Sequence, residues 1–180
     1  QRYLHDVKTA KKRGFYFDEE TANYACNFPR CFPHTKGAQF AGKPVVLEPW
    51  QAFITWNLFG WKIAETGLRR FRRAYINVAA KAGKTTFMAA VALLLALSDN
   101  PIEAGAEVYI VAPTHRQSMI LYGQSVEFVE AVEYLKKRAD VYKGDHKILW
   151  SASNARISPV VIGPNLDGIN AHAIIRDELH

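Results

Sequence analysis

The sequence predicts an α/β protein built on a mostly parallel sheet with helices on both faces. Two short apolar runs, Glu107–Ala112 and Ala171–Ile175, are typical of buried strands. Two longer segments, Lys84–Leu97 and His115–Lys137, have the apolar spacing of helices. Strands and helices that alternate along a chain favour a parallel sheet, because each crossover helix returns the chain to the same edge.

The other elements follow from local signals. Pro49 stands where helices prefer to begin, and the segment that follows it has helical spacing. Residues 26–47 are rich in Pro, Gly and aromatic residues and predict a loop laid over a core. In chain order we expect a helix over 1–25, a helix over Glu48–Ala64, a strand over Arg73–Ala79 and a hairpin formed by Lys147–Trp150 and Ala155–Ile162. We expect residues 1–46 to be an extension and residues 47–180 to be the main domain.

Composition narrows the class of partner. The chain has 180 residues, of which 49% are hydrophobic, and its net charge is +6. This excess suggests an anionic partner such as a nucleic acid, a nucleotide or a membrane surface. Cys26 and Cys31 are too few for a disulfide framework, which favours a reducing compartment. The longest apolar run, Met88–Leu97, is too short to span a bilayer, so we expect no membrane partner.

The most informative segment is a phosphate loop. Ala79-Ala80-Lys81-Ala82-Gly83-Lys84-Thr85-Thr86 stands between a predicted strand and a predicted helix. Backbone N–H groups and the dipole at a helix N-terminus favour a bound phosphate. Lys84 can reach the β- and γ-phosphates of ATP, and the Thr85 hydroxyl can hold Mg²⁺. Val78 occupies the position where the usual Walker A pattern has its first Gly, so a chance Gly-Lys-Thr at a helix start is the alternative.

A strand that ends in two carboxylates supplies the second half of such a site. Asp177 and Glu178 follow the apolar run Ala173–Ile175 and Arg176. In phosphate-loop ATPases a strand-end Asp holds Mg²⁺ and a neighbouring Glu activates the attacking water. Adjacent strand residues point to opposite faces, so Glu178 needs a bend to reach the nucleotide. The alternative is a solvated Asp-Glu pair that opens a helix.

These segments together resemble the ATPase domain of the large terminase subunit of tailed bacteriophages. The resemblance spans residues 40–180 and includes a phosphate loop that lacks its first Gly. It rests on Leu47-Glu48-Pro49-Trp50-Gln51, Phe59-Gly60-Trp61, Arg69–Arg73, Ala79–Thr85, Asp167–His172 and Asp177-Glu178-Leu179-His180.

The resemblance implies an ATPase that packages double-stranded DNA into a procapsid. It implies that Gln51 contacts the adenine, whose N6/N7 edge needs both a donor and an acceptor. It also implies ATP and Mg²⁺ as cofactors, and a homo-oligomeric ring on the portal protein. Further implications are a small terminase subunit as partner and the host cell cytoplasm as location. Full-length relatives carry a nuclease domain, which we do not expect here, and the sheet is expected to be truncated after the Walker B strand.

One departure concerns a catalytic arginine. The family usually has an arginine early in its phosphate loop, where this chain has Ala80. Either the enzyme is impaired or another arginine replaces it. The candidates are Arg69, Arg70, Arg72, Arg73, Arg116 and Arg156. Arg116 and Arg156 come first if they lie near the carboxyl end of the sheet.

Two other functions remain open at this stage. A helicase-like ATPase shares the phosphate loop, the adenine-side Gln and the Asp-Glu pair. A nucleotide-dependent assembly module would bind ATP and hydrolyse little of it.

Overall fold

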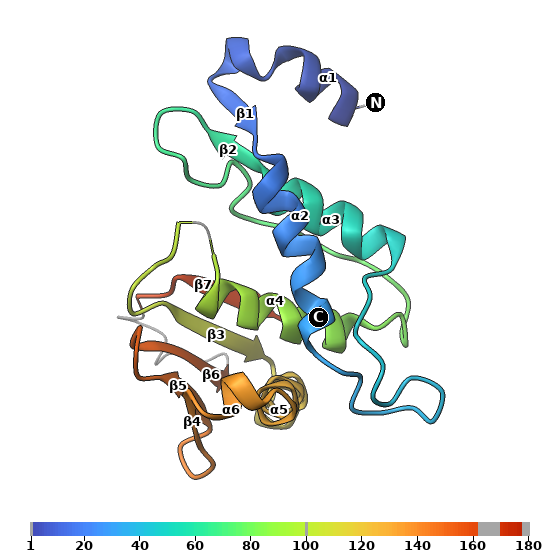
Figure 1. Cartoon of the computed structure of the whole chain (residues 1–180), viewed down its shortest axis with the longest axis vertical. Coiled ribbons are helices and arrows are strands. Elements are labelled where there is room, and N and C mark those ends of the chain that lie inside the picture. The colour runs from blue at the N-terminus through green and yellow to red at the C-terminus, as the bar shows by residue number, and fades with distance from the viewer. Residues whose placement is uncertain (1, 100, 162–169, 178–180) are drawn as a thin grey trace. The chain divides into compact units, whose positions relative to one another are not determined.

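The computed structural model describes residues 2–99, 101–161 and 170–177. The chain forms two compact units (Figure 1). Unit 1 comprises Gln1–Pro29 and Val46–Ala82, and unit 2 comprises Arg30–Val45 and Gly83–His180. These units divide the chain differently from the expected boundary after residue 46, which remains a prediction.

Unit 1 is mainly helical with a small sheet. It contains α1 (Arg2–Thr9), the 3-10 helix η1 (Lys11–Arg13), β1 (Phe15–Phe17), α2 (Glu19–Asn27), α3 (Pro49–Gly60) and β2 (Trp61–Ile63). The 3-10 helix η2 (Phe28–Cys31) spans the boundary between the units. The expected continuous helix over 1–25 is therefore wrong, and the helix expected to reach Ala64 ends at Gly60.

The interruption of the first helix has a local and a tertiary cause. Gly14 adopts the left-handed conformation, with a φ of 73°, and its N–H donates to the carbonyl of Lys11, which closes η1. Phe15–Phe17 then pairs antiparallel with β2, so that Tyr16 lies opposite Lys62. Because β2 comes more than 40 residues later in the sequence, the first 25 residues do not reveal this pairing on their own.

Aromatic rings fill the interior of unit 1. Phe17 lies 5.1 Å from Trp61 and 5.2 Å from Trp56, measured between ring centroids. Gly60 ends α3 beside these rings, and a Cβ at this position would overlap the ring of Phe17. The close approach of α3 to β1 therefore requires a residue without a side chain.

Unit 2 contains a five-stranded sheet in the order β4-β5-β6-β3-β7. β6 and β7 each pair in parallel with β3, whereas β5 pairs antiparallel with β4 and with β6. Four of the five strands thus run in one direction, which confirms the predicted α/β class with a mostly parallel sheet. The strands are β3 (Glu107–Ala112), β4 (Ala139–Tyr142), β5 (Lys147–Trp150), β6 (Ala155–Val161) and β7 (Ala173–Arg176).

Helices α4 (Lys84–Leu97) and α5 (His115–Ala131) pack against each other and against β3 and β6. The short helix α6 (Glu133–Lys136) follows α5, so the predicted helix over 115–137 is divided near Val132. Val108, Ile110, Ile148 and Ile157 are fully buried in this core. A second helix layer on the opposite face remains a prediction.

The loop Arg30–Val45 belongs to unit 2, where it lies against α5. Phe32 stacks on Phe128 with a centroid distance of 4.8 Å, and both rings are buried. Thr35 donates a hydrogen bond to Glu127, whose other carboxylate oxygen lies 2.8 Å from the Lys36 ammonium. The expected loop over a core is confirmed for residues 32–45. It is wrong for residues 26–31, because α2 extends to Asn27 and η2 follows it.

The strand expected over Arg73–Ala79 is absent. Residues 71–79 have no regular secondary structure, and Tyr75 is 75% exposed. A β-prone run becomes a strand only where a neighbouring strand takes up its N–H and C=O groups, and no described strand pairs with this segment.

Arg176 is a charged residue in β7, whose sequence is otherwise apolar. In the structure β7 is an edge strand of the described sheet, and Ile174 and Arg176 share an exposed face while Ile175 points into the core.

Candidate functional site

The N-terminus of α4 presents uncapped backbone groups. Gly83 is the N-cap residue and is left-handed, with a φ of 78°. Lys84 is the first helical residue, and no side chain caps the helix at Gly83. The first N–H groups of a helix have no partner within it, and the helix dipole adds partial positive charge at this end. An anion such as a phosphate is the natural ligand of this geometry.

The residues before Gly83 form an exposed turn. Lys81 also has a positive φ, 63°, which is rare for a residue with a side chain. Holding such a residue costs about 1–3 kcal/mol, and strained backbone of this kind concentrates at functional sites. When successive residues alternate between the right-handed and left-handed conformations, their N–H groups point to the same side. This creates a concave anion-binding surface. Ala79, Ala80 and Lys81 are exposed and thus accessible to a ligand.

The end of β7 positions the first acidic residue. The Asp177 N–H donates to the Val111 carbonyl at 3.0 Å, which extends the parallel pairing one residue past β7. Asp177 therefore lies at the carboxyl end of the sheet, beside the end of β3. Glu178, the predicted catalytic base, lies outside the described residues, as do Leu179, His180 and residues 167–169 of the acidic motif.

A hydrogen bond in unit 2 fixes the direction of α4 relative to β7. Asp99, two residues after α4, lies 2.9 Å from the Nε2 atom of His172, which immediately precedes β7. The carboxyl end of α4 is thus held at the amino end of β7. The helix runs antiparallel to the strand, and its N-terminus points toward the end of the sheet where Asp177 lies. Lys84 and Thr85 therefore share one end of unit 2 with Asp177.

The donor set at this end suits a hard divalent cation. Mg²⁺ prefers oxygen ligands, takes one or two from the protein and completes its shell with water and substrate phosphates. The Thr85 hydroxyl and the Asp177 carboxylate offer such oxygens, and both residues are partly exposed.

Gln51 has a structural role in unit 1. Its Oε1 atom accepts a hydrogen bond from the Glu48 N–H at 3.0 Å, and the Glu48 side chain accepts from the Gln51 backbone in return. This capping box begins α3, and Gln51 is only 5% exposed. The Nε2 donors and a second lone pair on Oε1 take no part in the capping box. Contact between Gln51 and adenine therefore remains a prediction.

Arg156 does not lie near the carboxyl end of the sheet, where a catalytic arginine was expected. It pairs with Glu107 in the parallel register, at the start of β3, and thus lies at the amino end of the sheet, away from Asp177. A carboxylate oxygen of Glu107 lies 2.5 Å from the Arg156 guanidinium, and Tyr109 donates to Glu107. The Tyr109 hydrogen bond and the Arg156 charge hold the pKa of Glu107 below its usual value. Arg156 therefore stabilises a polar cluster far from the phosphate loop.

Arg116, in contrast, lies near the carboxyl end of the sheet, as expected. It is exposed in the first turn of α5, which begins shortly after the carboxyl end of β3. Thr114 caps this helix by accepting from the Gln117 N–H. β3 and β7 run in parallel, so Arg116 and Asp177 lie at the same end of the sheet.

Sequence reasoning missed the residues that orient these elements. The Asp99–His172 contact joins positions 73 residues apart, and neither residue belongs to a pattern that predicts it. Asp6, which binds two arginines in unit 1, was also missed. Its only signal is that it is an isolated acid in a strongly basic segment.

Comparisons with known proteins agree with this geometry. Residues 49–180 match the family described as the ATPase domain of the terminase large subunit. The crystal structure of the large terminase of bacteriophage HK97 superposes on 91% of this chain with a TM-score of 0.71 and 17% sequence identity. At this identity the likeness shows the fold alone, and the chain covers 31% of the HK97 protein. No curated protein matches the chain in sequence.

Among the described helices, none is long and apolar enough to cross a membrane. The family match extends from Pro49, at the first residue of α3, through the phosphate loop and the strand that leads to Asp177. We conclude that this chain belongs to the terminase large subunit family and contains its ATPase domain.

Proposed function

We propose that this chain binds and hydrolyses ATP to drive double-stranded DNA into a procapsid. The observation that carries the proposal is the shared position of the α4 N-terminus and Asp177 at one end of unit 2. A helix N-terminus that follows a left-handed glycine and begins with Lys-Thr suits a triphosphate. A strand-end carboxylate at the same end of the sheet suits the metal that accompanies it.

Each residue of the site has a distinct role. The N–H groups of Ala82–Thr86 surround the phosphates, and the Lys84 ammonium neutralises charge on the β- and γ-phosphates. Thr85 and Asp177 would hold Mg²⁺, which when bound neutralises charge that develops during phosphoryl transfer. Glu178 accepts a proton from the water that attacks the γ-phosphate. Gln51 contacts the adenine.

The departure at Ala80 affects the rate of hydrolysis. Charge that develops on the γ-phosphate needs a nearby cation, and a lysine such as Lys81 lacks the bidentate fork of an arginine. We propose that turnover is limited by the missing arginine unless a neighbouring subunit supplies one. Arg116 is the better candidate because it is exposed at the start of α5, whereas Arg156 lies at the amino end of the sheet and is paired with Glu107.

The proposed partners follow from the family. Double-stranded DNA is the substrate that the motor moves, and the portal protein is the place where copies of the chain assemble into a homo-oligomeric ring. A small terminase subunit delivers the DNA, and the process takes place in the host cell cytoplasm.

The direct test is ATP hydrolysis by the purified chain with Mg²⁺. Lys84→Ala should abolish turnover and weaken binding of a fluorescent ATP analogue, because the ammonium that faces the β- and γ-phosphates is lost. Lys147→Ala is the matched control. Lys147 is also partly buried, but it is the first residue of β5, and its ammonium lies 3.8 Å from the Asp145 carboxylate. A Lys84→Ala protein that hydrolyses ATP as fast as the parent would place the site elsewhere. Stimulation by single-stranded but not double-stranded DNA would favour a helicase.

A further inference from the structure

The positive charge of the chain is concentrated in unit 1. This unit carries 11 Lys and Arg residues against 6 Asp and Glu residues, whereas the larger unit 2 carries 12 against 11. Unit 1 thus holds five of the six excess positive charges. In the sequence, most basic residues of unit 1 occur in two separate runs.

Asp6 brings these two runs together. The first run is Lys8–Arg13 and the second is Arg69–Arg73. Arg13 from the first donates to the Asp6 carboxylate at 2.8 Å, and Arg70 from the second donates to it at 3.2 Å. The Asp6 side chain is 6% exposed. Burial raises the pKa of Asp6, but the hydrogen bonds and charges of Arg70 and Arg13 together lower it by more. The pKa therefore lies below its usual value, and the carboxylate stays ionised.

Arg70 is committed to this contact, whereas Arg72 and Arg73 nearby face solvent. Its guanidinium lies 4.4 Å from the Phe15 ring centroid and 4.8 Å from that of Phe71, and its side chain is 8% exposed. Arg72 and Arg73 follow by two and three residues, so their Cα atoms lie within about 7 and 11 Å of the Arg70 Cα. Both are exposed.

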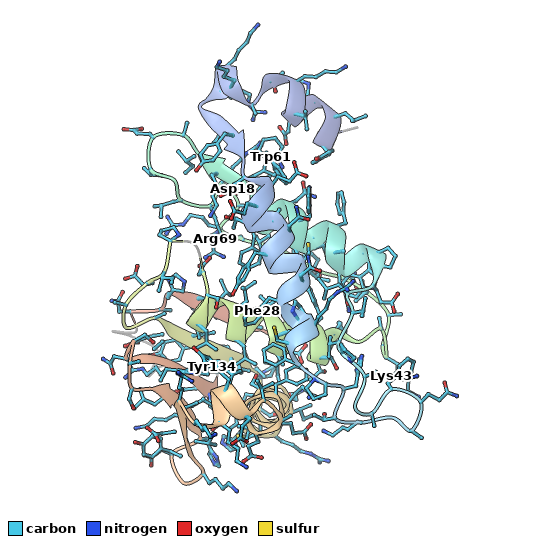
Figure 2. All side chains as sticks on the ribbon, viewed as in Figure 1. Asp18, Phe28, Lys43, Trp61, Arg69 and Tyr134 are labelled. Carbon is cyan, nitrogen blue, oxygen red and sulfur yellow. The ribbon has the colours of Figure 1, made fainter. Side chains whose placement is uncertain are left out.

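The first run contributes a short, fully exposed turn. η1 has the sequence Lys-Lys-Arg and buries none of its residues. Lys8, at the end of α1, is also exposed, and the Arg13 side chain is 44% exposed. Within the part of the chain that the structure describes, Lys8, Lys11, Lys12, Arg72 and Arg73 form no ion pair. Figure 2 shows nitrogen-tipped side chains that project from the α1 end of unit 1, and it labels Arg69 and Trp61 of the same unit.

We infer that the surface formed by Lys8, Lys11, Lys12, Arg13, Arg72 and Arg73, which we name the basic surface, binds the phosphate backbone of double-stranded DNA. The inference rests on the proposed function, because it takes DNA as the polyanion. DNA carries one negative charge per about 1.7 Å of helix axis, so several of these cations can meet phosphates at once. A three-residue 3-10 helix cannot enter the major groove as a recognition helix does, so base reading is not expected.

A lipid surface is the less suitable polyanion. α1 exposes Leu4 and Val7 beside Lys8, but it has only eight residues. Two apolar side chains bury too little area for stable insertion at a bilayer interface. Binding to anionic vesicles is therefore an outcome that would count against the inference.

The test is fluorescence anisotropy with a labelled DNA duplex, performed on the full chain over a range of salt concentrations. Lys11→Glu with Lys12→Glu should weaken binding at least roughly tenfold and reduce the slope of log K against log salt by about 2, since each phosphate contact contributes about 0.9. Arg72→Glu with Arg73→Glu should have a similar effect if both runs form one surface. Two duplexes of unrelated sequence should bind alike.

The matched control is Lys136→Glu with Lys137→Glu. These adjacent, exposed lysines at the end of α6 in unit 2 give the same change in net charge. Equal losses from the control and from either unit 1 pair would mean that only net charge matters, and would overturn the inference. So would a parent chain that binds anionic vesicles but not DNA.

ATP hydrolysis without DNA separates this inference from the proposed function. Lys11→Glu with Lys12→Glu should keep the parent rate, because neither lysine was assigned to the nucleotide site. A chain that hydrolyses ATP but shows no DNA binding would refute the basic surface and leave the ATPase intact. A chain that binds DNA through these residues but hydrolyses no ATP would support the basic surface and refute the proposed function.

Discussion

Replacing Asp6 by Asn removes the charge that holds Arg13 and Arg70 together in unit 1. Asn keeps the shape and one acceptor oxygen but cannot neutralise two guanidinium groups. A hydrogen bond to a charged group contributes about 1.5–3 kcal/mol, and breaking a buried ion pair costs about 3–5 kcal/mol. The Arg13 side chain is 44% exposed and regains water, so its share is small. Arg70, at 8% exposure, accounts for most of the loss.

We therefore expect Asp6→Asn to lower the free energy of unfolding by about 2–4 kcal/mol. For a chain of this size each kcal/mol lowers Tm by about 2–4 °C, so the fall should be about 5–15 °C. Thermal unfolding followed by circular dichroism near pH 7 measures it. Asp145→Asn is the control, because Asp145 is 71% exposed and its ion pair with Lys147 spans 3.8 Å. It should change the free energy of unfolding by less than about 0.5 kcal/mol.

The effect has a defined dependence on pH. The folded-state pKa of Asp6 lies below 3.8, its value in the unfolded chain. A carboxyl of this kind stabilises the fold fully above its unfolded pKa, and the stabilisation is lost as pH falls through the folded-state pKa. The difference in Tm between parent and Asp6→Asn should therefore be constant near neutral pH and shrink below about pH 4. Equal Tm values at pH 7, or a difference that grows on acidification, would refute the reasoning.

Three further predictions concern the nucleotide site and the core. Glu178→Gln should bind ATP as tightly as the parent but hydrolyse none, because the Glu178 charge serves to activate water rather than to hold Mg²⁺. Equal loss of binding and turnover would mean that Glu178 holds Mg²⁺ and Asp177 activates water. Ala80→Arg should raise ATP turnover roughly tenfold or more if the missing arginine limits the rate, and an unchanged rate would indicate that a neighbouring subunit supplies it. Phe128→Ala should lower the free energy of unfolding by about 3–5 kcal/mol in a urea titration, since it removes the ring stacked on Phe32. A loss below about 1 kcal/mol would show that the loop Arg30–Val45 can repack around the gap.

Local patterns in the sequence were enough to predict several elements of unit 2. The helix over Lys84–Leu97 and the strand over Glu107–Ala112 have the predicted bounds. Both are continuous apolar segments with clear limits, and their conformation is determined by side chains within a few residues. The hairpin of β5 and β6 follows from alternation around a polar turn, for the same reason.

The tertiary structure decided where charged residues lie. Arg156 and Arg116 looked equally suitable in the sequence, and only the parallel register of β6 with β3 places Arg156 at the wrong end of the sheet. The helix expected over 1–25 is broken because β1 pairs with β2, and residues 73–79 form no strand because no described strand pairs with them. Strand pairing depends on a partner distant in sequence, so β-propensity alone does not predict it.

The amino-acid sequence by itself determined the α/β class, the helix that begins after Gly83 and the resemblance to large terminases. These follow from local spacing, which acts over one helical turn or one strand. Only the tertiary structure showed that the α4 N-terminus and Asp177 share one end of unit 2, and that Asp6 joins two basic runs. The Asp6–Arg70 and Asp99–His172 contacts join residues more than 60 positions apart, and they form only when packing of the apolar core has brought the elements together.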